Sequence, residues 1–510
     1  MAVGFRLETL PLDRASGINL DRQIYLGLRD LIERRMLTSG SALPSTRMLA
    51  RDLGLGRNTV IAAYEQLALE GFVAIARGSA PVVKGLPAAP PSRGPESPKG
   101  GSALSERGRV MSALPFHHGV PGITAFHPGL PDADNFPFNT WSKLVARRTR
   151  LARADLFGSY YIMGYPPLCE AIARYLTASR GVACAPEQII ITTGAGAAFD
   201  LLARLLTDPG EPVWMEEPGY YGAGAAFLSA GARLVPLRVS ERGWDLSAPA
   251  ARPRVIFVTP SCHQPLGLTM AMEQRLNLLR LAAEADAWII EDDYDSEYRF
   301  QGQPIPALQG IARDGRVIFV GTFAKILFPA MRLGYIVVPQ DMRERLTAAL
   351  STTGQFAPLI TQAALADFIT EGHLTRHLRR MRRLYAERRQ YFMEQFDQHL
   401  SEWMELRRTD SGIQLVGLFR DQSRDDAAIA SEAKRQGVNV SPLSLQYRFE
   451  PKLRGLLMGF AAADAKATRK AIEKLAKVVD PTTRAGPRRR MPGDSDPVPI
   501  SAAPLPHRDF

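Results

Sequence analysis

The chain has 510 residues, 45% of them hydrophobic, which is enough for one large core and a smaller module. Its formal net charge of +11 favours a polyanionic partner, with nucleic acid ahead of an anionic membrane surface. The three cysteines have no paired spacing and no run nears the roughly 18 apolar residues of a membrane span, so we expect a cytoplasmic protein without a disulfide framework, metal centre or membrane partner.

Apolar residues recur at helical spacing between Leu20 and Ile32 and predict an amphipathic helix. Ser45 can cap a second helix, and Asn58 can cap a third that runs through Leu67. A break that contains glycine separates these two helices. This order predicts a helix-turn-helix.

Residues 71–76 and 80–83 are short apolar runs, and the turn Arg77-Gly78-Ser79 between them predicts a hairpin whose tip carries a cation. Such a hairpin could act as a wing that reaches a minor groove. A small three-helix domain that docks on another protein is the alternative. The places of Arg47, Arg57 and Arg77, at two helix starts and the hairpin tip, favour DNA.

The run LPSTRMLARDLGLGRNTVIAAYEQLALEGFV resembles the DNA-binding domain of GntR-type regulators, over residues 15–84. The resemblance implies that Arg47 and Arg57 contact phosphates and base edges of double-stranded DNA. It also implies that Asn58 and Thr59 enter the major groove. The full expected DNA-binding set is Ser45, Arg47, Arg57, Asn58, Thr59, Arg77 and Gly78.

Composition divides the chain further. The stretch from Gly85 to Ser102 is rich in Pro, Gly and Ser, so we expect a flexible linker over residues 85–115 between a module of residues 1–84 and a large domain of residues 116–479. Residues 480–510 turn again to Pro and Arg, with few large apolar side chains. We expect this tail to be disordered.

In the large domain, the apolar runs QIIIT, RVIFVTP, AWIIEDD and RVIFVGT alternate with helical stretches. This alternation predicts an α/β fold with a mostly parallel sheet covered on both faces. Ligands of such sheets bind beyond the carboxyl ends of the strands. We therefore ask which side chains follow each run.

After QIIIT, Gly194 and Gly196 open a helix whose first N–H groups could bind an anion. After AWII come Glu291, Asp292, Asp293 and Tyr294, after RVIFVG come Thr322 and Lys325, and after the first RVIFV comes a polar turn at 259–264. Each feature alone has a structural explanation, such as a solvated lysine or an exposed helix start. Together, an anion cradle, a carboxylate, a phenol, an amine and an amide suit pyridoxal phosphate.

RGVACAPEQIIITTGA, EEPGYYG, TPSCHQPLG, EDDYDSEYRF and GTFAKILFPAMRLGYIVVP resemble fold-type I aminotransferases, and in particular the MocR regulators, over residues 120–475. The implied cofactor is pyridoxal 5′-phosphate, with Lys325 as its Schiff-base lysine. Asp292 would pair with the pyridine nitrogen and Tyr294 with the phenolic oxygen of the ring. Tyr220 would stack on the ring.

The resemblance also implies a phosphate site and a homodimer, because fold-type I sites are built at a subunit boundary. The implied phosphate contacts are the backbone of Ala195 and Gly196, the hydroxyl of Thr322, the guanidinium of Arg332, and Tyr160 from a second subunit.

The chain departs from the aminotransferase pattern in three places. Gln264 precedes Pro265 where an asparagine is usual, so Gln264 or His263 would hold the ring oxygen. Leu457 stands where an aminotransferase presents the arginine that clamps a substrate carboxylate, unless Arg454 replaces it. Gly222 has no side chain that could contact an effector.

The arginine-rich run 373–390 could form a second DNA surface, but a long amphipathic helix with a solvated basic face is the favoured interpretation. Arg488, Arg489 and Arg490 could touch DNA or could simply solubilise the tail.

From these features we expect a pyridoxal phosphate-dependent transcription regulator that senses the cofactor itself or a reactive amine or amino acid. The alternative is a working aminotransferase with an accessory N-terminal domain, against which Leu457 counts. A third possibility, a regulator that has lost its cofactor, is opposed by the intact Lys325, Asp292, Tyr294 and Arg332. We expect little or no transamination.

Overall fold

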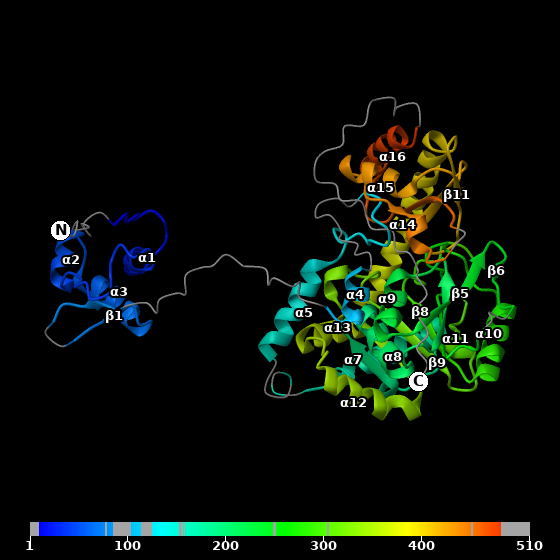
Figure 1. The fold of residues 1–510 in the computed structure, drawn as a ribbon, viewed down its shortest axis with the longest axis horizontal. Coiled ribbons are helices and arrows are strands. Elements are labelled where there is room, and N and C mark those ends of the chain that lie inside the picture. The colour runs from blue at the N-terminus through cyan, green and yellow to red at the C-terminus, as the bar shows by residue number, and fades with distance from the viewer. Residues whose placement is uncertain are drawn as a thin grey trace. The chain divides into compact units, whose positions relative to one another are not determined.

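The computed structural model describes residues 10–76, 79–84, 104–113, 125–151, 156, 158, 160–247, 251–302, 305–449 and 452–480. The chain divides into two compact units, Met1–Ala103 and Leu104–Phe510. Figure 1 shows the elements of each.

The first unit contains three helices and a small hairpin: α1 (Leu20–Glu33), α2 (Thr46–Asp52), α3 (Arg57–Leu69), β1 (Val73–Ala74) and β2 (Val82–Val83). The two strands pair antiparallel. One apolar core joins all of these elements, and Ile24, Leu49 and Val60 are fully buried in it. The expected helix-turn-helix with a hairpin is confirmed.

The helix caps of this unit explain its local structure. Ser45 caps α2 as expected, because its Oγ accepts a hydrogen bond from Met48 N at 3.2 Å. The cap expected at Asn58 is wrong, since Gly56 already has the extended backbone that precedes a helix, and α3 begins at Arg57. Asn58 is therefore the second residue of α3.

The second unit is built on an eight-stranded sheet with strand order β3-β10-β9-β8-β7-β4-β5-β6. Neighbouring strands from β9 to β5 run parallel, whereas β10 is antiparallel to both neighbours and β6 to β5. The mostly parallel sheet is confirmed. Its strands are β3 (Ile189–Thr192), β4 (Pro212–Glu217), β5 (Arg233–Ser240), β6 (Gly243–Trp244), β7 (Val255–Val258), β8 (Trp288–Asp293), β9 (Val317–Thr322) and β10 (Gly334–Val337).

Helices cover both faces of this sheet (Figure 1). They are α7 (Pro166–Arg180), α8 (Ala195–Leu206), α9 (Tyr221–Ala230), α10 (Met272–Ala285), α11 (Leu308–Ile311), α12 (Arg343–Thr353) and α13 (Leu359–Thr370). Alternate strand residues face opposite sides. Ile190 and Ile336 pack with α8, α9 and α12, whereas Ile189 and Val337 pack with α7 and α13.

A smaller C-terminal part follows the long helix α14 (His373–His399), and its four-stranded sheet has the order β11-β12-β14-β13 with antiparallel pairs. Two helices pack beside this sheet. Its elements are β11 (Met404–Arg407), β12 (Gln414–Phe419), α15 (Asp426–Arg435), β13 (Ser441–Pro442), β14 (Gly455–Gly459) and α16 (Ala465–Val479).

Helix α14 has one buried apolar face, formed by Leu374, Leu378, Met381 and Tyr385 among others. Some of its arginines bind groups of the protein: Arg388 Nη1 lies 2.7 Å from Asp132 Oδ2, and Arg382 Nε donates to Glu297 O at 2.6 Å. These contacts favour the amphipathic helix over a second DNA surface.

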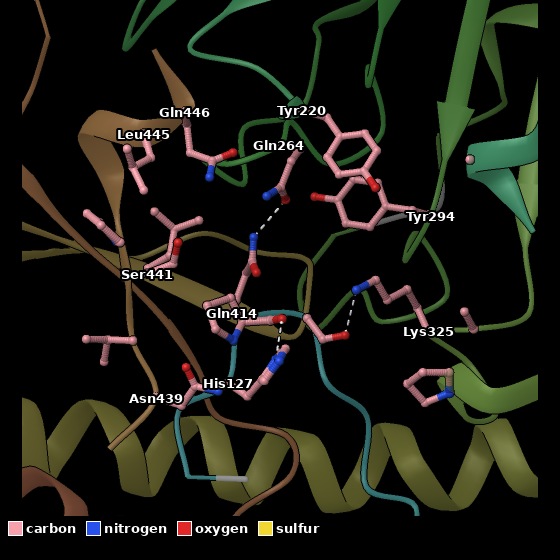
Figure 2. A pocket seen from close by; sticks show the side chains of 18 of the residues that line it. His127, Tyr220, Gln264, Tyr294, Lys325, Gln414, Asn439, Ser441, Leu445 and Gln446 are labelled. Carbon is pink, nitrogen blue, oxygen red and sulfur yellow. Dashed lines mark hydrogen bonds between the residues drawn. The ribbon is translucent and has the colours of Figure 1, made fainter. Parts of the chain in front are cut away.

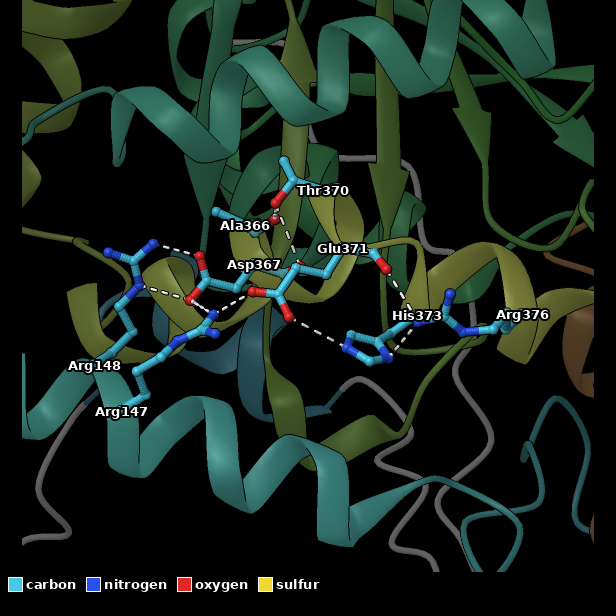
Figure 3. Close-up of polar contacts among 8 residues, drawn as sticks. All are labelled: Arg147, Arg148, Ala366, Asp367, Thr370, Glu371, His373 and Arg376. Carbon is cyan, nitrogen blue, oxygen red and sulfur yellow. Dashed lines mark hydrogen bonds and ion pairs between the residues drawn. The ribbon is translucent and has the colours of Figure 1, made fainter.

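Helix α5 (Phe138–Leu151) is held against α13 by charge pairs, as Figure 3 shows. Asp367 accepts hydrogen bonds from Arg147 Nη2 at 2.6 Å and Arg148 Nε at 2.7 Å. Partial burial acts to raise the pKa of Asp367, but the two guanidinium groups outweigh it and hold this pKa below its usual range. Glu371 extends the network to Arg147 and His373.

Helix α4 (Glu106–Ala113) lies against α9, although its residues fall in the segment expected to be a flexible linker. In the described part of the chain, no helix is long and apolar enough to cross a membrane. No group of three or more potential metal ligands occurs among those same residues.

Candidate functional site

The carboxyl ends of the central strands meet at a cavity of about 620 Å³. The segments that follow β3, β4, β7, β8 and β9 all contribute lining residues, as the rule for parallel sheets predicts. The smaller C-terminal part closes the other side (Figure 2).

Lys325 follows β9 and reaches into this cavity from the sheet side (Figure 2). Its Nζ donates a hydrogen bond to Gly129 O at 2.7 Å, and a Cβ at residue 129 would lie only 2.5 Å from that nitrogen. Burial lowers the pKa of Lys325, while the negative charges of Asp295 and Asp292 partly offset this effect. A lysine with a lowered pKa is a better nucleophile toward a carbonyl carbon.

Asp292 lies at the end of β8 and is only 3% exposed. Its Oδ1 has no hydrogen-bond partner among the described residues. Burial, and then the nearby Asp293, Glu216 and Asp295, raise the pKa of this carboxyl group well above its usual value. A buried carboxylate without a partner is costly, so the site suits a cationic ring nitrogen, which the pyridine of pyridoxal phosphate provides.

The start of α8 also lines the cavity. Gly194 has a φ of +99°, which allows the sharp turn from β3 into a helix that begins at Ala195. A Cβ at residue 194 would lie 3.9 Å from Arg332 Cζ, and Thr322 and Gly196 line the same cavity. Free N–H groups at a helix start, beside a guanidinium, suit a phosphate.

Tyr220, Tyr294 and Gln264 also line the cavity. The Tyr294 hydroxyl donates to Cys262 Sγ at 3.6 Å, and Gln264 Oε1 accepts from Gln414 Nε2 at 2.7 Å. Of the two side chains expected to replace the usual asparagine, Gln264 reaches the cavity. His263 is fully buried elsewhere, where its ring packs edge-on against Trp244.

Tyr160 does not line the cavity of its own chain and is 85% exposed. Its expected role across a subunit boundary stays a prediction. Leu457 does line the cavity, from β14. Arg454, considered as a replacement clamp, is absent from the lining, and its Nη1 lies 3.3 Å from Asp426 Oδ1 instead.

Sequence reasoning missed the lining residues that come from the smaller C-terminal part and from the segment before α5. No motif marks them, because they reach the cavity only in the folded chain: most come from β12, α15 and the residues around β13, and the others come from the segment before α5. They are His127, Gly129, Gln414, Ser431, Lys434, Asn439, Ser441, Leu445 and Gln446, with several apolar neighbours.

In the first unit, Arg47, Arg57 and Asn58 are exposed on α2 and α3, and Thr59 is half-buried. Arg57 Nε donates to Thr46 Oγ1 at 3.3 Å, which links the starts of the two helices. The expected wing residues Arg77 and Gly78 lie outside the described residues.

Comparison with known families covers both units. Residues 20–83 match the model of the bacterial regulatory proteins of the gntR family, and residues 130–475 match the model of aminotransferase class I and II.

Two similar proteins align with at least 90% of this chain, and one solved structure aligns with 73% of it. The chain is 48% identical, over 91% of its length and 95% of the other protein, to the "Probable rhizopine catabolism regulatory protein MocR" of Rhizobium meliloti. It is 30% identical, over 90% of its length and 96% of the other, to the "HTH-type pyridoxine biosynthesis transcriptional regulator PdxR" of Corynebacterium glutamicum. The structure of LysN, an α-aminoadipate aminotransferase of Thermus thermophilus complexed with N-(5′-phosphopyridoxyl)-L-leucine, is similar with a TM-score of 0.67 and 25% identity, over 73% of this chain and 96% of that one.

Proposed function

Because this chain belongs to the MocR type of regulators, which join a gntR-family DNA-binding domain to an aminotransferase class I and II domain, we propose that it regulates transcription in response to a small molecule bound in its second unit. Residues of α2 and α3 contact operator DNA. The effector is pyridoxal phosphate itself or an amine or amino acid that reacts with it.

Pyridoxal phosphate is the cofactor of the second unit, and the residues of the cavity fit it. When bound, it supplies an aldehyde that reacts covalently with amines. Lys325 provides the amine of the protein, and Asp292 keeps a proton on the pyridine nitrogen. Arg332 and the start of α8 bind the phosphate, and Tyr220 packs against the ring.

A single observation favours sensing over turnover. Leu457 lines the cavity and stands where the aminotransferase pattern has the arginine that clamps a substrate carboxylate, and Arg454 is bound to Asp426. A charge-assisted hydrogen bond contributes about 1.5–3 kcal/mol, or roughly ten- to a hundredfold in binding, and poor orientation costs further rate. An amino acid would therefore bind weakly and react slowly.

The second candidate is a working aminotransferase, which the otherwise intact cavity and the likeness to LysN favour. In either case we propose a cytoplasmic homodimer, in which the exposed Tyr160 approaches the partner's phosphate site. The domain boundaries near residues 84, 115 and 479 are part of the same proposal.

DNA binding is tested by the salt dependence of operator affinity for the full chain. Arg47→Ala and Arg57→Ala should each lower the slope of log affinity against log salt by about one, because each loses a phosphate contact. Arg57→Ala should also relax base choice. Arg34→Ala, an exposed change at the end of α1, is the matched control. Unchanged slopes and affinity in both variants would remove the helix-turn-helix from the DNA interface.

A further inference from the structure

A second, smaller cavity of the large unit lies apart from the cofactor site and shares no described lining residue with it. Its volume is about 150 Å³. Because one water molecule occupies about 30 Å³ in the liquid, this cavity has room for a few waters or for one small ion. Its lining is rich in guanidinium and hydroxyl groups, among them those of Arg180, Arg299, Arg382, Ser261, Thr269 and Ser411.

Backbone pairing places two of these residues side by side. Phe300 N, in the segment after β8, donates to Asp410 O, in the segment before β12, at 2.7 Å. Arg299 and Ser411 are opposite each other in the antiparallel bridge that results. Directly opposite residues of an antiparallel pair have their side chains on the same face. The two segments therefore supply a guanidinium and a hydroxyl to the same wall of the cavity.

Arg299 has donors that the described residues do not use. Its Nη1 donates to Thr269 Oγ1 at 3.3 Å, which is a long hydrogen bond. Its Nε is buried and has no hydrogen-bond partner in the described part of the chain. A buried donor of a charged group without an acceptor is costly. An anion in the cavity would remove that cost.

The other two arginines add positive charge to the same space. Arg180 is 7% exposed, and its Nε pairs with Asp293 Oδ2 at 2.7 Å while its Nη2 donates to Ser261 Oγ at 2.5 Å. Arg382 is exposed, and its Nε donates to the backbone oxygen of Glu297 at 2.6 Å. Three guanidinium groups are therefore balanced by the carboxyl groups of Asp293 and Glu297 alone.

Glu297 is the acidic residue of the described lining, and its environment weakens its charge. Its Oε1 accepts a hydrogen bond from the Tyr175 hydroxyl at 2.7 Å. Burial, and then the negative charge of Asp293, raise the pKa of Glu297, which favours the neutral carboxyl group. The cavity therefore keeps an excess of positive charge.

The hydroxyl groups of the lining add neutral donors. Ser411 is 2% exposed and lies near the Cys262 thiol, but its Oγ makes no hydrogen bond of normal geometry to a described residue. A hydroxyl hydrogen can rotate toward a ligand. Oxyanions with several acceptor oxygens bind guanidinium and hydroxyl donors at the same time.

We propose that this second cavity binds a small oxyanion, phosphate or sulfate, through Arg299, Arg382 and Ser411. Water can fill the space but supplies no charge to balance the two arginines that have no carboxylate partner. The inference goes beyond the proposed regulatory function and does not depend on it.

Calorimetry with inorganic phosphate and with sulfate tests the site on the full-length protein, at an ionic strength held constant with chloride. Pyridoxal phosphate is first fixed to Lys325 with borohydride, so that the phosphate position of the cofactor cavity is filled. At least one of the two ions should then bind saturably, with a Kd in the millimolar range or tighter. The ion that binds more tightly identifies the ligand.

Variants assign the binding to the second cavity. Arg299→Gln should weaken the oxyanion about tenfold or more, because a charge-assisted donor is lost. Arg383→Gln removes the same charge from an exposed position of α14 outside the lining and is the matched control. Arg382→Gln should also weaken binding, and it keeps the test decisive if Arg299→Gln does not fold.

Crystals of the same protein soaked in the ion that binds should show it within hydrogen-bond distance of the Arg299 side chain. The inference would be overturned if neither ion binds saturably, if the lining variants bind as tightly as the parent, or if Arg383→Gln weakens binding equally. Water alone in the soaked cavity would also overturn it. Operator affinity plays no part in these measurements, so their failure leaves the proposed regulatory function untouched.

Discussion

Lys325 is suited to react as a nucleophilic amine. Burial lowers its pKa, and a hydrogen bond to Gly129 O holds its nitrogen in the cavity. After addition of pyridoxal phosphate and borohydride, mass spectrometry should find the cofactor fixed at Lys325. Lys325→Ala should lose this adduct, whereas Lys470→Ala, an exposed change on α16, should keep it. Labelling of a different lysine in the parent would contradict the assignment.

Glu216 should make the folded protein less stable as the pH rises. Burial raises its pKa to about 7, despite hydrogen bonds from Thr259 and Trp244. The folded state therefore holds this proton more tightly than the unfolded state. Its contribution to stability falls as pH rises from about 4.5 through 7, by up to about 3 kcal/mol.

Urea unfolding at pH 5 and pH 8 measures that contribution. Glu216→Gln stays neutral, so its stability should fall less over this range than that of the parent, and other titrating groups cancel in the comparison. Glu187→Gln, at an exposed position, should follow the parent. Identical pH slopes for the parent and Glu216→Gln would show that Glu216 is ionised in the folded protein throughout.

Residues at strand ends were predictable from the sequence, and residues brought in by tertiary folding were not. Lys325 and Asp292 follow apolar runs, so the rule for parallel sheets brings them to one edge. Gln414 belongs to β12 of the smaller sheet and Gln446 follows β13, so both meet this edge only in the folded chain. The cap expected at Asn58 was wrong because Gly56 took the extended conformation first.

At the scale of elements, charge pairs fix α5 to α13. Asp367→Asn should lower the free energy of unfolding by about 1–2 kcal/mol, because a side chain only 9% exposed loses two partners that are themselves partly exposed. Glu371→Gln, at a side chain 40% exposed, should cost below about 1 kcal/mol. Urea unfolding measures both, and equal losses would mean that burial of Asp367 adds nothing.

The sequence predicted where a helix begins when the residues directly before the helix carry the start signal. Helix α8 starts directly after Gly194, and α2 starts after its Ser45 cap. Helix α4 was not foreseen, because its sequence has no clear apolar face; in the structure it lies against α9. Sequence periodicity predicts a helix only when the apolar residues of that helix recur at helical spacing.

At the scale of the whole molecule, the proposed function requires a change at the cavity to reach the segment that leads to the first unit. Tyr220 lines the cavity and directly precedes α9, and α4 packs against α9. A ligand that moves Tyr220 can thus shift α4, which begins three residues after the division between the units. Such a shift biases DNA binding only if the two ligand states differ in free energy.

The central claim is that ligand binding at the second unit controls operator affinity without appreciable turnover. One measurement tests it directly: operator affinity and product formation are followed in the same sample, with pyridoxal phosphate, a keto acid, and a panel of amines and amino acids. The account predicts that at least one of these ligands changes operator affinity several-fold while product formation stays negligible, and that Lys325→Ala loses this response to amines but still binds DNA. Rapid multiple turnover with unchanged operator affinity would contradict it and identify an aminotransferase.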